Sequence, residues 1–297
     1  MKILIIGSKG FIGSHCVDYF SNKGFEVWEA DVNASQKEKF YKIERKNSDF
    51  SVAFKENKFD VCINASGSAH VGFSFENPSL DFELNVVNVQ KILVAIRDYN
   101  SNCKFINFSS AAVYGNPKVL PISESTDCKP LSPYGFHKLQ SELLLTEYHK
   151  FFGLNTCSLR VFSAYGPGLK KQLFWDLYQK AAQNNAVSLF GTGNETRDFI
   201  FIDDLLEIIK LIIDKSPFTG SIYNVASNTE TTIAQAANVF IKEFSPQKKL
   251  VFNGETKIGD PNNWVADISK ISEMGFQKTV GIEEGIKKYA KWVKELK

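Results

Sequence analysis

Long apolar runs, paired cysteines and an excess of either charge are all missing from this sequence. No stretch approaches the about 20 consecutive apolar residues that a membrane-spanning helix needs. Lysine and arginine together number 35 against 33 aspartates and glutamates, so no charge imbalance favours nucleic acid or an anionic membrane as a partner. We therefore expect a protein that binds neither nucleic acid nor membrane.

The five cysteines and four histidines also form no recognisable cluster. No CxxC pair occurs, and three cysteines lie in apolar segments, which is typical of buried free thiols. No HExxH motif occurs, so we expect no metal site. His70 and His137 have no assignable partner and are expected to serve packing or solvent contact. The unpaired thiols predict a reducing, cytoplasmic compartment. The first residues, MKILIIGSKGFIG, indicate a strand rather than a signal peptide.

Short apolar runs alternate with helical patterns through the first half of the chain. Strands are expected at residues 2–6, 25–31, 60–66, 103–110 and 155–163. Long helices are expected at 79–99 and 134–152. This alternation implies right-handed crossovers and a parallel sheet covered on both faces. The predicted fold class is therefore α/β, a Rossmann-type doubly wound parallel sheet with a smaller C-terminal substrate-binding lobe.

The pattern changes after residue 166, where loops and polar residues become more frequent. A helix at 203–214 and a strand at 221–227 then indicate a return to the main sheet. The smaller lobe would cover the carboxyl ends of the strands, where ligands bind in such sheets. We expect a dinucleotide-binding domain of residues 1–163 plus 196–227 and a substrate lobe of residues 164–195 plus 228–297.

Three glycines at every third position, Gly7, Gly10 and Gly13, separate the first strand from the first helix. Glycines let such a turn tighten and let the backbone approach a pyrophosphate at the helix N-terminus. Any short turn can use glycine, but here an apolar strand precedes the loop and an amphipathic helix follows it. The loop therefore favours a bound dinucleotide.

Asp31 ends the second expected strand, where a carboxylate can bind the ribose hydroxyls of the dinucleotide. The alternative for Asp31 is a solvated turn residue. A carboxylate there repels a 2′-phosphate, which favours NAD over NADP. Lys9 places a cation in the same region, so NADP stays the alternative cofactor.

Several motifs occur in the order found in one protein family. They are GSKGFIG (7–13), SSAAVYG (109–115), YGFHK (134–138), GTGNETRDFIFIDDL (191–205) and VADISKISEMGF (265–276). Over almost its whole length the chain resembles the extended short-chain dehydrogenase/reductases, in the nucleotide-sugar epimerase/dehydratase branch. The resemblance implies a nucleotide-diphosphate sugar as substrate and a homodimer formed through the two long helices.

The resemblance places the catalytic base at Tyr134, its partner at Lys138 and a hydroxyl donor at Ser110. Residues four apart share a face of a helix, so the ammonium of Lys138 is expected to lower the pKa of the phenol from about 10. Each feature has a plain alternative, since a tyrosine–lysine pair is common at helix starts and a serine can simply end a strand. Their coincidence with a phosphate loop favours the catalytic interpretation.

The resemblance also implies contacts to the cofactor and the substrate. Cofactor-binding residues would be Gly7, Gly10, Phe11, Ile12, Gly13, Asp31, Ala65, Ser66, Lys138 and Phe162. Substrate-binding residues would be Ser110, Tyr134, Ser163, Arg197 and Lys257. Trp264 falls where the family has an aromatic near the sugar, and Ser163 replaces the family's usual asparagine. The alternative for Arg197 is a surface arginine beside Asp198.

Dehydratases of this branch carry an acidic pair directly after the position of Ser110, whereas this chain has Ala111 and Ala112. Elimination of water is therefore disfavoured. We expect an NAD-dependent nucleotide-sugar 4-epimerase, in which Tyr134 takes the C4 hydroxyl proton while hydride passes to NAD and returns to the opposite face. The alternative is an NAD(P)H-dependent 4-keto-6-deoxy nucleotide-sugar reductase, and a non-catalytic dinucleotide-binding scaffold is the third hypothesis.

Overall fold

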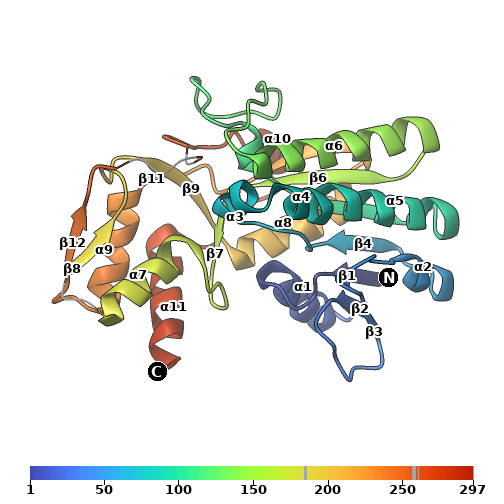
Figure 1. The fold of residues 1–297 in the computed structure, drawn as a ribbon, viewed down its shortest axis with the longest axis horizontal. Coiled ribbons are helices and arrows are strands. Elements are labelled where there is room, and N and C mark those ends of the chain that lie inside the picture. Colours follow the sequence, from blue (N-terminus) through green and yellow to red (C-terminus); the bar gives the residue numbers. More distant parts are fainter. Residues whose placement is uncertain (184–185, 256–258, 260, 297) are drawn as a thin grey trace.

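The computed structural model describes residues 1–183, 186–255, 259 and 261–296 (Figure 1). The first elements are β1 (Lys2–Ile6), α1 (Phe11–Asn22), β2 (Glu26–Asp31), β3 (Phe40–Lys42), α2 (Ser51–Glu56), β4 (Val61–Asn64), α3 (Val71–Glu76), α4 (Pro78–Phe82), the π-helical turn η1 (Glu83–Val87), α5 (Asn88–Tyr99), β5 (Lys104–Ser110), the 3-10 turn η2 (Ala111–Val113), α6 (Pro133–Phe152) and β6 (Thr156–Val161). The later elements are β7 (Ser163–Tyr165), α7 (Gln172–Gln183), β8 (Ala186–Leu189), β9 (Thr196–Phe201), α8 (Ile202–Lys215), β10 (Thr219–Val225), β11 (Glu230–Thr232), α9 (Ile233–Phe244), β12 (Lys249–Phe252), α10 (Ser269–Glu273) and α11 (Ile282–Glu295).

The central sheet has seven parallel strands in the order β10-β6-β5-β4-β1-β2-β3. The order runs outward from β1 in both directions, so the sheet is doubly wound and the strand order reverses at β1. Each of the five predicted strands is present within a few residues of its expected ends. The structure thus confirms the predicted α/β Rossmann-type fold.

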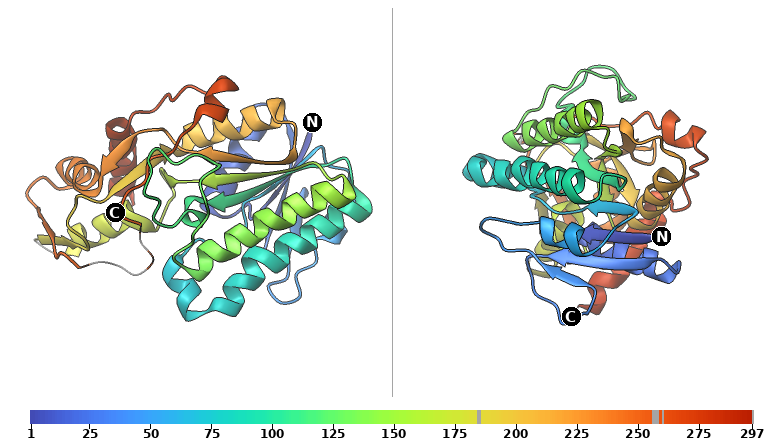
Figure 2. Two further views of the ribbon diagram at one scale, coloured as in Figure 1. Left: turned by 90° about the horizontal axis from the view of Figure 1, so that it is seen from above. Right: turned by 90° about the vertical axis from the view of Figure 1, so that its right-hand side faces the viewer.

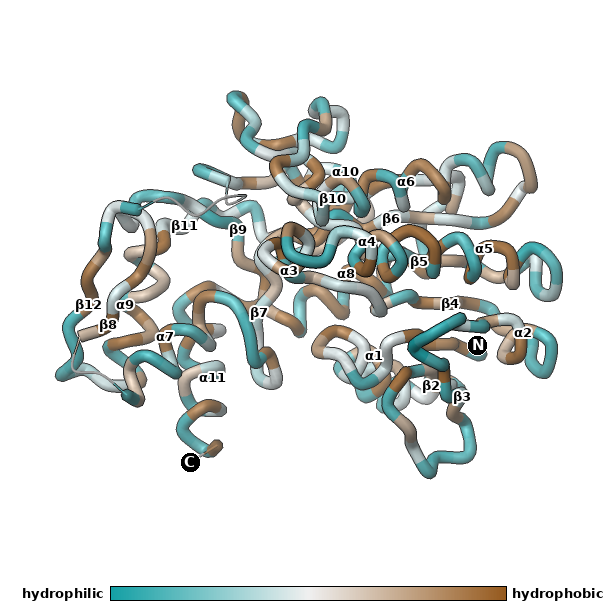
Figure 3. Tube along the Cα trace, viewed as in Figure 1, coloured by the Kyte–Doolittle hydropathy of each residue, from teal (hydrophilic) through white to brown (hydrophobic). Residues whose placement is uncertain are grey.

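Alternate residues of β1 face opposite sides of the sheet, as the two-residue period of a strand requires. Ile3 and Ile5 belong to the core formed with α1 and α8, whereas Leu4 and Ile6 belong to the core formed with α2, α5 and α6. All four are buried, and each contributes about 1.5–3 kcal/mol by leaving water. Figure 2 shows α5 and α6 side by side on their face of the sheet, and Figure 3 shows that the loop joining β2 to β3 is hydrophilic.

The helix expected at 134–152 is α6, and specific residues explain where it begins and ends. Ser132 caps its start, Pro133 occupies its first position, and Gly153 ends it with a φ of 69°. The single helix expected at 79–99 is observed as α4 and α5, joined by the π-helical turn η1. The apolar periodicity of the sequence did not predict this turn. No helix within the described ranges is long and apolar enough to cross a membrane.

The remaining strands form two small sheets, β11-β9-β7 and β12-β8. Residues 196–201, which we grouped with the dinucleotide-binding domain, form β9 and pair with β7 and β11 instead of the main sheet. The supposedly loop-rich stretch 164–195 contains the helix α7. The core of this region continues into the main core, with Phe174, Phe240 and Tyr289 in the same apolar cluster as Ile3. The division into two domains stays a prediction.

The cysteines are confirmed as free thiols, and four of the five are buried. Burial raises the pKa of each of these four far above its ordinary value. They are therefore packing residues rather than nucleophiles.

Candidate active site

The glycine loop after β1 folds tightly between β2 and β4. The amide of Gly7 donates to the carbonyl of Ala30 at 2.8 Å, and the amide of Ala65, just past β4, donates to Ile6 at 2.8 Å. An ideal Cβ on Gly13 would lie 2.1 Å from the carbonyl oxygen of Gly7, so any side chain there would collide with the loop. This close return of α1 onto the loop leaves a cradle that fits a pyrophosphate.

The first turn of α1 completes this cradle. Gly10 precedes the helix in an extended conformation, and no side chain caps the helix start. Phe11 and Ile12 form the first turn and are half-buried. The first N–H groups of a helix have no partner within the helix and carry its positive end, so they can bind an anion.

Asp31 is fixed at the end of β2 by two backbone donors. Its carboxylate accepts the N–H of Lys9 at 2.9 Å and the N–H of Asn33 at 2.8 Å. The ammonium of Lys9, which kept NADP open as an alternative, lies 3.5 Å from Glu29. The cation is therefore matched by a carboxylate, and the site fits an unphosphorylated ribose, as in NAD.

A chain of hydrogen bonds that sequence reasoning missed crosses the sheet beneath the site. Ser66 donates to Asn64 at 2.6 Å, Asn64 to Asn107 at 2.8 Å, and Asn107 to Ser141 at 3.2 Å. Ser141 in turn donates to the carbonyl of Lys138 at 2.7 Å. The hydrogen bonds join the end of β4 to α6, the helix that carries Tyr134 and Lys138.

The start of α6 approaches the turn after β5 very closely. Ser132 accepts the N–H of Gly135 at 3.1 Å and so caps the helix. An ideal Cβ on Gly135 would lie 2.6 Å from the carbonyl oxygen of Ala112. Only glycine permits this approach, which places the first turn of α6 against the end of β5.

Tyr134, Lys138 and Ser110 come together at this junction. The ammonium of Lys138 lies 5.8 Å from the centroid of the Tyr134 ring, and both side chains are buried. Burial raises the pKa of Tyr134 to about 12, while the hydrogen bond with Ser110 lowers it and the charge of Asp81 raises it further. Lys138 donates to the carbonyl of Phe108 at 2.9 Å, and burial lowers its pKa to about 8.

The expectation that Lys138 lowers the pKa of Tyr134 is wrong for the protein alone. Desolvation dominates because the phenol lies in an apolar cluster with Ala112, Phe162 and Trp264. The ammonium turns toward a backbone carbonyl. The hydrogen bond with Ser110 does not offset the effect of burial on the pKa of the phenol.

The residues expected on the substrate side lie around the same apolar cluster. Phe162 meets Trp264 edge to face with ring centroids 5.9 Å apart, and the guanidinium of Arg197 lies 5.7 Å from the ring of Trp264. Ser163 begins β7 and is half-buried. Lys257 lies outside the described residues. The structure thus brings Phe162, Trp264 and Arg197 together with Tyr134.

Asp198, which offered the alternative explanation for Arg197, serves another purpose. It is fully buried and accepts the N–H of Ser227 at 2.9 Å and the N–H of Ala266 at 3.1 Å. Arg197, half-buried, donates instead to the carbonyl of Thr196 at 2.8 Å. Neighbouring residues of a strand face opposite sides, which separates the two charges.

A buried ion pair, also missed, supports the catalytic end of the sheet. Arg160 of β6 forms two parallel hydrogen bonds with Glu142 of α6, at 2.7 and 2.9 Å. It also donates to the hydroxyl of Tyr114 at 2.9 Å, while Ser109 donates to Glu142 at 2.5 Å. Ser109 precedes Ser110 and Glu142 lies one turn after Lys138, so the pair fixes both elements of the site.

The two histidines assigned to packing or solvent both have specific partners. His70 caps α3 by accepting the N–H of Phe73 at 2.8 Å. Nδ1 of His137 lies 2.6 Å from a carboxylate oxygen of Asp81, which is fully buried in α4. The contact of His70 is local to the start of α3, whereas that of His137 joins α6 to α4 and has no signal in the spacing of either helix.

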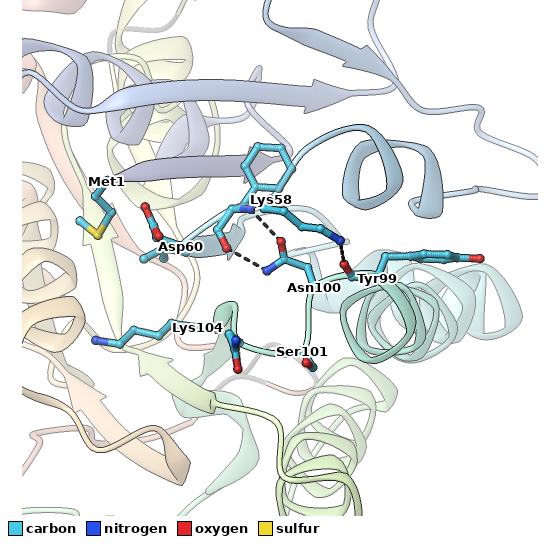
Figure 4. A pocket seen from close by; sticks show the side chains of 10 residues that line it. Met1, Lys58, Asp60, Tyr99, Asn100, Ser101 and Lys104 are labelled. Carbon is cyan, nitrogen blue, oxygen red and sulfur yellow. Dashed lines mark hydrogen bonds between the residues drawn. The ribbon is translucent and has the colours of Figure 1, made fainter.

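A hollow at the other edge of the sheet lies away from these residues (Figure 4). It is lined by the amino ends of β4 and β5 and by the end of α5. Its polar groups are engaged locally: Lys58 donates to the carbonyl of Tyr99, and Asn100 exchanges two hydrogen bonds with the backbone of Phe59. Ligands of doubly wound sheets bind at the opposite, carboxyl edge, so we assign it no role.

Comparison with known proteins places these features in a family. A model of the NAD dependent epimerase/dehydratase family matches residues 3–226. Protein CapI of Staphylococcus aureus is 28% identical, with 99% of each chain covered, and CDP-paratose 2-epimerase of Salmonella typhi is 26% identical, with 100% of each covered. The solved UDP-glucuronic acid 4-epimerase from Bacillus cereus, in complex with UDP-glucuronic acid and NAD, is 27% identical, covers 100% of both chains and has a TM-score of 0.89.

The match with the family extends over most of the chain and includes both the glycine loop and the Tyr134–Lys138 helix. Together with Asp31, which favours an unphosphorylated ribose, it identifies the cofactor as NAD. The chain belongs to the NAD-dependent epimerase/dehydratase family, and is an enzyme of the extended short-chain dehydrogenase/reductase class.

Proposed function

We propose that this protein is an NAD-dependent nucleotide-sugar 4-epimerase. The observation that carries the proposal is the meeting of Ser110, Tyr134 and Lys138 at the carboxyl edge of the sheet, the same edge at which the glycine loop follows β1. Ala111 and Ala112, both buried, stand where a dehydratase of this branch has its acidic pair. The site can therefore move a proton and a hydride, but it lacks an acid and a base for eliminating water there.

Tyr134 is the residue placed to move the proton of the sugar hydroxyl. Ser110 holds that hydroxyl while the phenolate oxygen of Tyr134 takes its proton, and the same phenol later returns the proton to the sugar oxygen. When bound, NAD supplies the hydride acceptor and donor at C4 and a positive charge that favours the phenolate. Lys138 is anchored on the carbonyl of Phe108, next to Ser109 and Ser110, and we assign it to holding the nicotinamide ribose.

The substrate side of the proposal rests on Arg197, Ser163 and Trp264. A guanidinium suits the oxygens of a diphosphate because its N–H groups form a planar fork. Trp264 holds Arg197 near the cluster that contains Tyr134. We assign the diphosphate to Arg197 and the sugar to the space between Trp264 and Tyr134, with residues 164–195 and 228–297 forming the substrate lobe.

The reaction is tested by offering sugar nucleotides to the purified protein. UDP-, dTDP-, CDP- and GDP-sugars are ranked by thermal shift, since a ligand of the folded state raises its stability. We expect one class to raise the Tm and to be converted to its 4-epimer, followed by NMR, without net consumption of added NADH. Oxidation of NADH with a 4-keto sugar would show a reductase instead, an alternative that the relatives named above do not favour.

Asp31→Ala is expected to weaken NAD binding by roughly tenfold while changing NADP binding much less. The substitution removes the carboxylate that bonds the ribose hydroxyls, and two such hydrogen bonds contribute on the order of 1–3 kcal/mol. Titration calorimetry with each dinucleotide on cofactor-stripped protein measures the ratio. Glu26→Ala, an exposed carboxylate at the start of the same strand, is the matched control. If Asp31→Ala leaves the ratio of the Kd values for NAD and NADP unchanged, residues other than Asp31 must recognise the ribose.

We also propose that the protein is a homodimer formed through α5 and α6. These helices lie side by side on one face, and α6 exposes Phe136 at 54% and Leu143 at 61%. The double variant Phe136→Glu/Leu143→Glu is expected to change a dimeric mass to a monomeric one in size-exclusion chromatography with light scattering. Phe190→Glu, exposed at 53% outside this face, should leave the dimer intact. A monomeric parent protein would contradict the proposal.

A further inference from the structure

Asp81 and His137 form an unusual pair for two residues on separate helices. The carboxylate of Asp81 is fully buried, and one of its oxygens lies 2.6 Å from Nδ1 of His137. Its other oxygen is also buried and has no hydrogen-bond partner among the described residues. A buried carboxylate with so little solvation exerts its charge over a longer range than a surface carboxylate does.

The pair involves the same helix as the proposed base. His137 precedes Lys138 in α6 and follows Tyr134 by less than one turn, while Asp81 reaches α6 from α4. The imidazole is mostly enclosed, with the ring of Phe82 against it at a centroid distance of 5.4 Å. Asp81 and His137 are therefore held in place on the side of α6 that faces α4.

Few other charges act on the base from the elements packed around it. The negative charge of Asp81 raises the pKa of both Tyr134 and Lys138, whereas Lys171 lowers and Glu142 raises that of Lys138. On α3 and η1, the titratable side chains are Glu76 and the capping His70, which are exposed, and Glu83, which is half-buried. On α5, they include Lys91, which is half-buried, and the exposed pair Arg97 and Asp98. Asp81 is thus the acidic side chain that most directly opposes the phenolate.

We propose that Asp81 and His137 are positioning residues that set the ionisation of Tyr134, with Asp81 opposing the phenolate and His137 offsetting Asp81. The contact with Nδ1 of His137 offsets part of the charge of Asp81, so the phenolate forms more readily while this contact is intact. Without His137, neither oxygen of the buried carboxylate has a partner among the described residues, and Asp81 acts more strongly on the phenol. This inference rests on the proposed function, because it assigns the base to Tyr134.

The test compares His137→Gln with Asp81→Asn in the full-length, NAD-loaded protein. The phenolate of Tyr134 is titrated by near-ultraviolet absorbance, as the difference between each protein and its Tyr134→Phe derivative, and kcat is measured over the same pH range. We expect His137→Gln to move both midpoints up by roughly 0.5–1 pH unit, and Asp81→Asn to move them down by a similar amount.

Shifts of opposite sign separate this role from a structural one. If the pair only holds α4 against α6, both variants should lower the Tm and kcat without moving the midpoints, and that result would overturn the inference. His149→Gln, at the far end of the same helix, where the ring contacts the carbonyl of Leu154 at 2.9 Å, should leave the midpoint unchanged. If the phenolate midpoints shift in opposite directions but the protein converts no sugar nucleotide, the proposed function is wrong. The inference that Asp81 and His137 set the ionisation of Tyr134 would still hold.

Discussion

Replacing Tyr134 by phenylalanine is expected to lower kcat by roughly 10²- to 10⁴-fold, the range that proton transfer by a positioned side chain contributes. The change removes one oxygen from a buried ring and keeps the ring in its apolar cluster with Phe162 and Trp264. We therefore expect the Kd for NAD to stay within about threefold and the free energy of unfolding to change by less than about 1.5 kcal/mol. Steady-state kinetics, calorimetry and urea denaturation measure the three quantities.

The matched control is Tyr178→Phe, which removes a hydroxyl from a half-buried tyrosine of α7 packed on Trp175 and Phe244. This variant should turn over like the parent protein. Parent-like turnover in Tyr134→Phe itself would remove the phenol from the mechanism and leave Ser110 as the group to examine next.

Arg160→Met is expected to cost about 3–5 kcal/mol of unfolding free energy, because it leaves the carboxylate of Glu142 buried without its cation. Against a typical total of about 5–15 kcal/mol, such a loss brings the protein close to unfolding at moderate temperature. The loss should also appear as lower kcat, since Glu142 lies one turn from Lys138 and bonds Ser109 beside Ser110. Urea denaturation followed by circular dichroism measures the stability.

The double variant Arg160→Met/Glu142→Leu removes both charges and should be more stable than either single variant, since no unpaired buried charge remains. Lys288→Met, which breaks an exposed pair of α11 with both partners about half exposed, is the surface control and should cost about 0.5 kcal/mol or less. If the single variant Arg160→Met is as stable as this control, water must reach the carboxylate of Glu142, and the pair is not shielded from solvent.

The architecture of the main sheet was predictable because each strand repeats the apolar pattern of a sheet covered on both faces. The small sheets were not, since strands such as β8 and β12 are short and half-exposed, and their pattern differs little from that of a loop. The assignment of β9 failed for a related reason. An apolar strand leading into a helix looks the same whether it pairs with β7 or with the main sheet.

The shared location of Tyr134 and Lys138 was predictable because both residues lie on one helix, α6, while their catalytic role stays a proposal. Contacts between elements gave no such signal. The hydrogen bond of Asp81 to His137 and the ion pair of Arg160 with Glu142 depend on how α4, α6 and β6 pack. The high pKa of Tyr134 depends on its enclosure, which residue spacing does not report.

The position of β10 has a consequence for the growing chain on the ribosome. This strand covers β6 at one end of the main sheet, but it is synthesised only after β7, α7, β8, β9 and α8. Until then, the buried apolar strand β6 has one row of backbone N–H and C=O groups without a neighbour, a template for association between nascent chains.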